Sequence, residues 1–468
     1  MSATVQATFD LARRFRQEEK YDTALHLLEV CLETHPKSGA IWDQYGRVLY
    51  EQEKYAASVI AFQKAMALEE TDNSRTALAE ALARVRRYEE ATRCRAPLLP
   101  RNPTNVDMWR AQARDLRNGR MNREVIELVD AHEAAETPHP KLQLQRALAR
   151  LILDDYTTGF ADYESRIEAE GLTWSGVRAP KWAGEDLTAK SILVMPEQGF
   201  GDAILTARFL PALKARGAHV SMYVKPPLRR LFGGLRGLDE MVETDAPPDS
   251  YDYFSPVFSL PHQLGTTPET VPPPAQLVIP EDSRERARNR LAPYGNDFRI
   301  GIVWTGTERL PFNKARRVDL PEYARLAALP GVQLFSLYKG PAIGQLKEHG
   351  LRNTIVDAGS SDRDFADTAG LIEQMDLMVT CDTAVVHVAA SLGKPVWNLM
   401  PTEGFWFYGS GDTTPWYPSM RLYRQTRTGD WSPVFRRIEQ DVMPLIAQKR
   451  ARVLAAGEKT GQPETQTG

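Results

Sequence analysis

The chain has 468 residues, of which 42% are hydrophobic and 25% charged, a composition typical of folded globular domains. This length predicts two to four domains, because one domain takes roughly 100–200 residues. The formal net charge is only -3 and no long basic run occurs, which disfavours nucleic acid and anionic membranes as partners.

The three cysteines, Cys31, Cys94 and Cys381, lie far apart and match no metal-binding spacing. Few, scattered cysteines are typical of a reducing compartment. The N-terminus lacks the apolar core of a signal peptide. No stretch approaches the roughly 18 apolar residues of a spanning helix. We therefore expect a soluble cytoplasmic protein with no membrane span.

A short turn followed by an apolar helix recurs through the first third of the chain. The equivalent positions are Tyr21, Tyr55, Tyr88, Asn122 and Tyr156, at spacings of 34, 33, 34 and 34 residues. This is the period of tetratricopeptide repeats, in which antiparallel helix pairs stack into a solenoid with a concave groove. We expect such a solenoid over residues 1–168, with a groove suited to a peptide or partner protein.

Residues 169–190 form an irregular but aromatic linker, after which short strands and helices alternate. This alternation favours parallel sheets with crossover helices. Strands are expected at 191–195, 219–224, 298–304, 332–337, 377–380 and 395–399, and helices at 202–215, 322–328, 365–375, 384–392 and 433–455.

A proline-rich stretch at 266–280 divides the alternating region into two series. We expect two Rossmann-like lobes, at 191–280 and 281–455, the second ending in the closing helix. Ligands bind such folds at the carboxyl ends of the strands. The polar tail, 456–468, is expected to be disordered.

The segment Glu197–Asp202 directly follows the first strand and opens a helix. Gly199 and Gly201 allow a tight turn and close approach of the backbone to a ligand. Helix starts attract anions. Asp202 is a candidate general base for an incoming hydroxyl, and its alternative role is a helix N-cap.

A second strand-to-helix junction spans Cys381–His387. Asp382 or Thr383 can cap the helix, whose first N–H groups would face a ligand. His387 follows one turn later and could donate to a phosphate or a sugar hydroxyl. The alternative for this histidine is a packing role.

The loop after the strand at 298–304 contains Thr305, Gly306 and Arg316, which could face a diphosphate leaving group. Lys339 is a similar candidate in a later loop. Both cations could instead belong to solvated surface. The Asp-x-Asp pair of Asp362 and Asp364 could hold a metal, but we favour a role at the start of the next helix.

These motifs resemble those of the ADP-heptose:lipopolysaccharide heptosyltransferases, and more closely those of bacterial tetratricopeptide proteins that carry such a domain. The matching segments are Glu197–Asp202, Phe209–Leu213, Asp364–Ala369, Asp382–Pro395, Trp416–Pro418 and Gly429–Trp431. The resemblance implies a GT-B fold, which has two Rossmann-like lobes, and an inverting reaction without a metal.

By the same resemblance, Asp202 would be the general base and Asp382 would contact the donor sugar. Thr383, Ala384 and His387 would bind the donor's phosphates. Ala384 departs from the glycine of the heptosyltransferases, which puts ADP-heptose as the donor in doubt.

The leading functional hypothesis is transfer of a sugar from a nucleotide-sugar donor to a protein hydroxyl, with the repeats capturing the acceptor. The layout resembles protein O-glycosyltransferases, including enzymes that modify flagellin. One alternative is transfer to a lipopolysaccharide or capsule glycan. Another is a non-catalytic repeat scaffold with a degenerate transferase domain. No cofactor is expected besides the nucleotide-sugar co-substrate.

Overall fold

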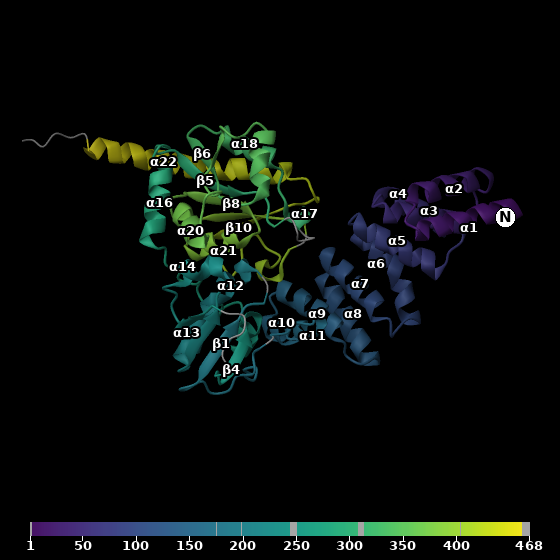
Figure 1. Ribbon diagram of the computed structural model, residues 1–468, viewed down its shortest axis with the longest axis horizontal. Coiled ribbons are helices and arrows are strands. Elements are labelled where there is room, and N and C mark those ends of the chain that lie inside the picture. Colours follow the sequence, from purple (N-terminus) through teal and green to yellow (C-terminus); the bar gives the residue numbers. More distant parts are fainter. Residues whose placement is uncertain are drawn as a thin grey trace, which may run out of the picture. The chain divides into compact units, whose positions relative to one another are not determined.

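The computed structural model describes residues 2–174, 176–197, 199–243, 250–307, 313–402 and 404–460. The chain forms two compact units, whose elements are labelled in Figure 1. The first comprises residues 1–150 and 165–171, and the second comprises residues 151–164 and 172–468. The predicted order of a helical repeat region followed by an α/β region is confirmed.

The repeat region consists of paired helices. They are α1 (Ala3–Gln17), α2 (Tyr21–Thr34), α3 (Gly39–Glu51), α4 (Tyr55–Leu68), α5 (Asp72–Arg84), α6 (Tyr88–Arg95), α7 (Val106–Asn118), α8 (Asn122–Ala135), α9 (Pro140–Ile152) and α10 (Tyr156–Tyr163). A short 3₁₀ helix, η1 (Ala96–Arg101), extends α6, and α11 (Arg166–Ala169) follows α10. Each turn inside a pair holds one non-glycine residue with φ between 58° and 63°: Glu19, Glu53, Arg86, Arg120 and Asp154. This left-handed residue recurs at the predicted repeat spacing.

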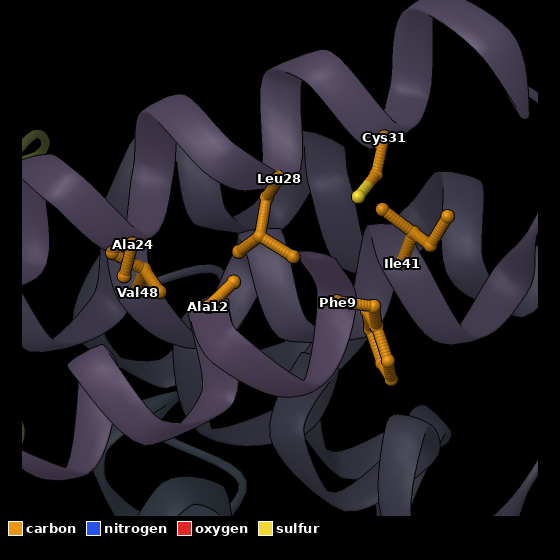
Figure 2. Packing of buried hydrophobic residues seen from close by; sticks show 7 residues of the cluster. All are labelled: Phe9, Ala12, Ala24, Leu28, Cys31, Ile41 and Val48. Carbon is orange, nitrogen blue, oxygen red and sulfur yellow. The ribbon is translucent and has the colours of Figure 1, made fainter. Parts of the chain in front are cut away.

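Small residues allow the two helices of a pair to approach closely. At Gly46 of α3, an added Cβ would lie 2.8 Å from the ring of Phe62 in α4. Ala12 is fully buried at the equivalent place in α1. Figure 2 shows the buried apolar cluster between α1, α2 and α3, which consists of Phe9, Ala12, Ala24, Leu28, Cys31, Ile41 and Val48. Burial of such side chains is the main stabilising contribution to the repeats.

The first lobe of the second unit contains a four-stranded parallel sheet in the order β3-β2-β1-β4. Its strands are β1 (Ser191–Met195), β2 (His219–Tyr223), β3 (Glu240–Val242) and β4 (Tyr253–Pro256). Its short helices are α12 (Phe200–Thr206), α13 (Leu210–Ala215), α14 (Arg229–Phe232) and α15 (Leu260–Gln263). The helix predicted at 202–215 is present as one continuous helical segment, with a 3₁₀ turn at Ala207–Phe209 where Pro211 lacks the amide hydrogen for a regular α-helical bond.

The second lobe contains a six-stranded parallel sheet in the order β10-β9-β8-β5-β6-β7. Its strands are β5 (Phe298–Val303), β6 (Val332–Ser336), β7 (Ile355–Asp357), β8 (Leu377–Cys381), β9 (Val396–Met400) and β10 (Met420–Arg424). Its helices are α16 (Glu281–Leu291), α17 (Asn313–Arg316), α18 (Leu320–Ala327), α19 (Gln345–Glu348), α20 (Phe365–Glu373), α21 (Ala384–Ser391) and α22 (Ser432–Thr460). All residues of β8 and β9 are buried, as in a sheet covered on both faces.

The linker between the repeats and the first sheet is packed. Trp182 is fully buried, and its backbone N–H donates to the carbonyl of Phe254 in β4 at 2.8 Å. The N–H of Phe254 donates in turn to the carbonyl of Pro180 at 3.0 Å. The linker therefore extends the edge of the first sheet.

Two boundaries differ from the predicted ones. The predicted repeat domain ends at residue 168, whereas residues 151–164, including α10, pack with the second unit. The predicted tail starts at residue 456, whereas α22 continues to Thr460, and the rest of the tail lies outside the described residues. Across the described ranges, no helix is long and apolar enough to cross a membrane.

Candidate functional site

Asp202 lies in the first turn of α12, directly after β1. Gly199 is the N-cap residue of this helix, and its N–H donates to Oδ2 of Asp202 at 2.7 Å. Asp202 is therefore not the cap itself, which differs from the alternative considered for it. Gly199 has φ of -90°, so its conformation does not require glycine.

The environment of Asp202 raises the pKa of its carboxyl group to about 6. The largest cause is removal of the carboxylate from water, and the negative charges of Asp382 and Glu197 add to it. The hydrogen bond from Gly199 acts in the opposite direction. A carboxyl group with such a pKa is suited to accept a proton near neutral pH.

Asp382 follows β8 and is buried. Its Oδ1 accepts a 2.6 Å hydrogen bond from the hydroxyl of Tyr408, and its carbonyl accepts a 2.8 Å bond from Nη1 of Arg316. Burial raises its pKa to about 6, against the opposing effects of Tyr408 and Arg316. Asp382 is thus held by partners on two sides.

Helix α21 begins immediately after Asp382. Thr383 is its N-cap residue, and the Thr383 hydroxyl is buried without a hydrogen-bond partner among the described residues. A buried, unpaired hydroxyl at a helix start is suited to contact a ligand oxygen. Ala384 is the first residue of the helix.

His387 is buried one turn into α21. Its Nδ1 lies 3.1 Å from the hydroxyl of Tyr417. Burial, with a smaller contribution from the charge of Arg208, lowers its pKa to about 3. His387 is therefore neutral at physiological pH, and would act as a hydrogen-bonding group rather than as a cation.

The starts of α12 and α21 meet between the two lobes. A Cβ built on Gly201 would lie 2.8 Å from Cδ2 and 3.2 Å from Nε2 of His387, and 3.6 Å from Cα of Ala384. The structure thus brings Asp202, Asp382 and His387 into one region. Gly201, expected to make room for a ligand, makes room for His387 in this structure.

The loop after β5 is organised by Asn313. Its Oδ1 accepts from the N–H of Gly306 at 2.9 Å and from Nε of Arg316 at 3.1 Å, while its Nδ2 donates to Oγ1 of Thr305 at 3.0 Å. Any side chain at position 306 would overlap the guanidinium of Arg316. Thr305, Gly306 and Arg316 therefore lie next to the Asp382 turn, as one hydrogen-bonded group.

Lys339 contacts a different part of the lobe. Its ammonium group donates to the backbone carbonyl of Asp362, in the loop before α20. This interaction is local and structural. It gives no support to the expected role of Lys339 in binding the donor.

Asp362 and Asp364 have separate structural roles. Asp364 caps α20 and accepts from the N–H of Ala366 at 3.0 Å, as the preferred interpretation of the sequence held. Asp362 accepts from Arg290 at 2.8 Å and from Thr368 at 2.9 Å. Within the described part of the chain, no group of three His, Cys, Asp or Glu side chains could hold a metal ion.

Three residues of this region were not predicted as site residues: Arg208, Tyr408 and Tyr417. Arg208 is buried, donates from Nη1 to the carbonyl of Trp416 at 2.6 Å and lies over the ring of Tyr417. Their chemical roles depend on tertiary contacts. The available sequence signals were the aromatic run at 405–408, which includes Tyr408, and the segment Trp416–Pro418, which includes Tyr417.

Comparison with known proteins finds a family similarity in the second lobe. Residues 360–402 match the family model described as glycosyltransferase family 9 (heptosyltransferase). This segment covers α20, β8, α21 and β9, and thus includes Asp382 and His387.

A relative covers most of the chain. Protein FlbA of Caulobacter vibrioides is 23% identical over an alignment of 468 positions. This alignment covers 93% of this chain and 72% of the relative.

Two solved structures have weak overall similarity. A glycosyltransferase family 9 structure from Veillonella parvula has a TM-score of 0.41 and 16% identity, and covers 54% of this chain and 92% of its own. The tetratricopeptide protein YrrB, described as having an unusual peptide-binding site, has a TM-score of 0.33 and 14% identity. The match covers 35% of this chain and 85% of YrrB.

The repeat period, the two parallel sheets and the family match agree with one another. The chain therefore combines a tetratricopeptide-like repeat region with two Rossmann-like lobes, and residues 360–402 of the second lobe are similar to glycosyltransferase family 9.

Proposed function

We propose that the protein is an inverting, metal-independent glycosyltransferase that moves a sugar from a nucleotide-sugar donor to a hydroxyl group. The observation that carries the proposal is the meeting of Asp202 with the start of α21. Asp202 has a pKa raised to about 6. The α21 start carries Asp382 and His387, inside the segment that matches the glycosyltransferase family.

In the proposed reaction, Asp202 accepts the proton of the acceptor hydroxyl. The hydroxyl oxygen then forms a bond to the anomeric carbon of the donor, while the bond from that carbon to the donor's phosphate oxygen breaks. One displacement inverts the configuration. Asp382 would contact the donor sugar, and Thr383, Ala384 and His387 would contact its phosphates.

The charge of the leaving phosphate needs stabilisation, for which the α21 start and Arg316 are suited. The first N–H groups of a helix carry a partial positive charge. Arg316 lies behind the same turn through its 2.8 Å bond to the Asp382 carbonyl. Together these groups could supply the stabilisation that a metal ion supplies elsewhere.

The acceptor we propose is a serine or threonine hydroxyl of a protein, captured by the repeats. Stacked helical repeats commonly bind extended partners. Flagellin is the first acceptor to test, because of the layout noted in the sequence. The free thiols of Cys31, Cys94 and Cys381 suit a cytoplasmic reaction.

The test uses the purified full-length protein with a panel of ADP-, GDP-, UDP- and CMP-linked sugars. Flagellin or lipopolysaccharide is added as the acceptor, and intact-mass analysis follows the products. The proposal expects nucleotide release and a mass increase on the protein acceptor. Modification of lipopolysaccharide alone would replace the protein acceptor with a glycan. Absence of transfer and of donor binding across the panel would favour the non-catalytic scaffold.

A further inference from the structure

Helix α10 belongs to the repeat pattern by sequence, but packs within the second unit. The hydroxyl of Tyr156 accepts a 2.9 Å hydrogen bond from Nε1 of Trp416. The rings of Phe160 and Tyr163 lie 5.5 Å and 5.6 Å from that of Trp406. This helix therefore lies against both tryptophans of residues 405–418, here named the aromatic loop.

The aromatic loop contacts the candidate site through the residues that follow each tryptophan. After Trp406, Tyr408 donates its 2.6 Å hydrogen bond to Asp382. After Trp416, the hydroxyl of Tyr417 lies 3.1 Å from Nδ1 of His387. The loop thus connects α10 to the two residues proposed to contact the donor sugar and its phosphates.

Both connections are buried and closely packed. Trp406 and Trp416 are 5% and 1% exposed, and their ring centres are 5.6 Å apart. Phe407 also connects the loop to the site, because its ring centre lies 5.3 Å from that of Trp406 and 5.8 Å from that of His387. Close-packed interiors transmit small displacements, because each side chain leaves little free volume for its neighbours.

We propose that α10 is a positioning element of the donor site. It holds the aromatic loop so that Tyr408 and Tyr417 orient Asp382 and His387. This inference rests on the proposed function for the identity of the ligand, but the positioning itself is a property of the protein alone. It makes the last helix of the repeat pattern a functional part of the transferase domain.

The critical variant is Tyr156→Phe. It keeps the ring but leaves the buried indole N–H of Trp416 without an acceptor, which is costly in a protein interior. The loop then has to shift to regain a partner. The matched control is Tyr50→Phe in the first unit, which removes a bond of equal length, 2.9 Å, from Nε of Arg84. A second variant, Phe160→Leu, tests the packing without changing a hydrogen bond.

Two readouts are measured on the full-length protein. The first is the ¹⁵N spectrum of the His387 imidazole, assigned with His387→Gln, which reports the tautomer and needs no ligand. The second is affinity for ADP, GDP, UDP and CMP by calorimetry. We expect Tyr156→Phe and Phe160→Leu to shift the His387 signals and to weaken nucleotide binding about 3- to 10-fold, a loss of the size expected for one hydrogen bond.

The control Tyr50→Phe should leave both readouts unchanged. Wild-type His387 signals in Tyr156→Phe and Phe160→Leu would overturn the positioning role, whatever the nucleotide results. If no nucleotide binds the wild-type protein while the His387 signals still shift, the proposed function fails and the positioning role stands.

Discussion

Gly201 of the first lobe lies against His387 of the second, at a distance that leaves no room for a methyl group. A Cβ added to Gly201 would lie 2.8 Å from Cδ2 of the imidazole, closer than side chains tolerate. The imidazole is itself buried and held by Tyr417, so it has little freedom to move aside.

The substitution Gly201→Ala is therefore expected to push the starts of α12 and α21 apart. Overpacking of this kind costs typically about 1–3 kcal/mol. We predict a lower urea midpoint and weaker nucleotide binding. Gly199→Ala is the matched control, because an added Cβ there would meet nothing closer than 3.6 Å. Equal stability and binding in the two variants would show that the lobes are not held together at this point.

The pH dependence of transfer should show an acid limb near pH 6. Asp202 and Asp382 both have their pKa raised to about 6, mainly by burial. Since the base must be deprotonated to accept a proton, kcat/KM should rise with pH through this region. A rate that is constant from pH 5 to pH 8 would argue against a carboxylate base whose pKa is raised to about 6.

Stability should change in the opposite direction. The ordinary pKa of an aspartate is 3.8, so between about pH 4 and pH 6 the folded chain binds more protons at these two sites than the unfolded chain does. The contribution of these groups to the free energy of unfolding therefore falls as the pH rises through this window. Urea unfolding of the wild type and of Asp202→Asn, compared at pH 4.5 and pH 7, measures this difference.

Truncation should reveal where the second unit begins. A chain starting at Leu151 keeps α10, whereas one starting at Gly171 loses Tyr156 and Phe160, which are almost fully buried. At roughly 1.5–3 kcal/mol for each large apolar side chain, the shorter chain should lose about 3–6 kcal/mol of stability. It should also bind the dye ANS through exposed Trp406 and Trp416. Equal thermal midpoints for the two fragments would contradict this assignment.

Much of the fold could be predicted because its signals are local. The strand expected at 191–195 coincides with β1, since a short apolar run between polar segments has few other solutions. The repeat period could be recognised because the helix pairs share the same turn and have a small residue, such as Ala12 or Gly46, at the same place. Strands β3, β4, β7 and β10 were missed. β3 and β7 are only three residues long and each includes a charged residue, and β4 ends in a proline, so these strands have little pattern of their own.

The site was predicted only in part, for a physical reason. Asp202 and Asp382 follow strands, and strand ends are where ligands bind in such sheets, so position alone singled them out. Tyr408 and Tyr417 contact Asp382 and His387 from a loop that has no regular pattern. Their placement depends on tertiary packing, because the neighbouring Trp406 and Trp416 lie against α10. The contacts of Lys339 were equally unpredictable, and they connect it to Asp362 rather than to the site.

The most direct test of Asp202 as the general base is the transfer rate of Asp202→Asn, measured with the donor and acceptor found by the panel. Asparagine keeps the size of the side chain and an oxygen that can accept from Gly199, but it cannot act as the base. The matched control is Asp319→Asn, an exposed N-cap residue of α18 whose side chain makes no capping bond. We expect a loss of about 10²- to 10⁴-fold in rate for Asp202→Asn, with folding and donor affinity retained and the control fully active. A wild-type rate in Asp202→Asn would contradict this role.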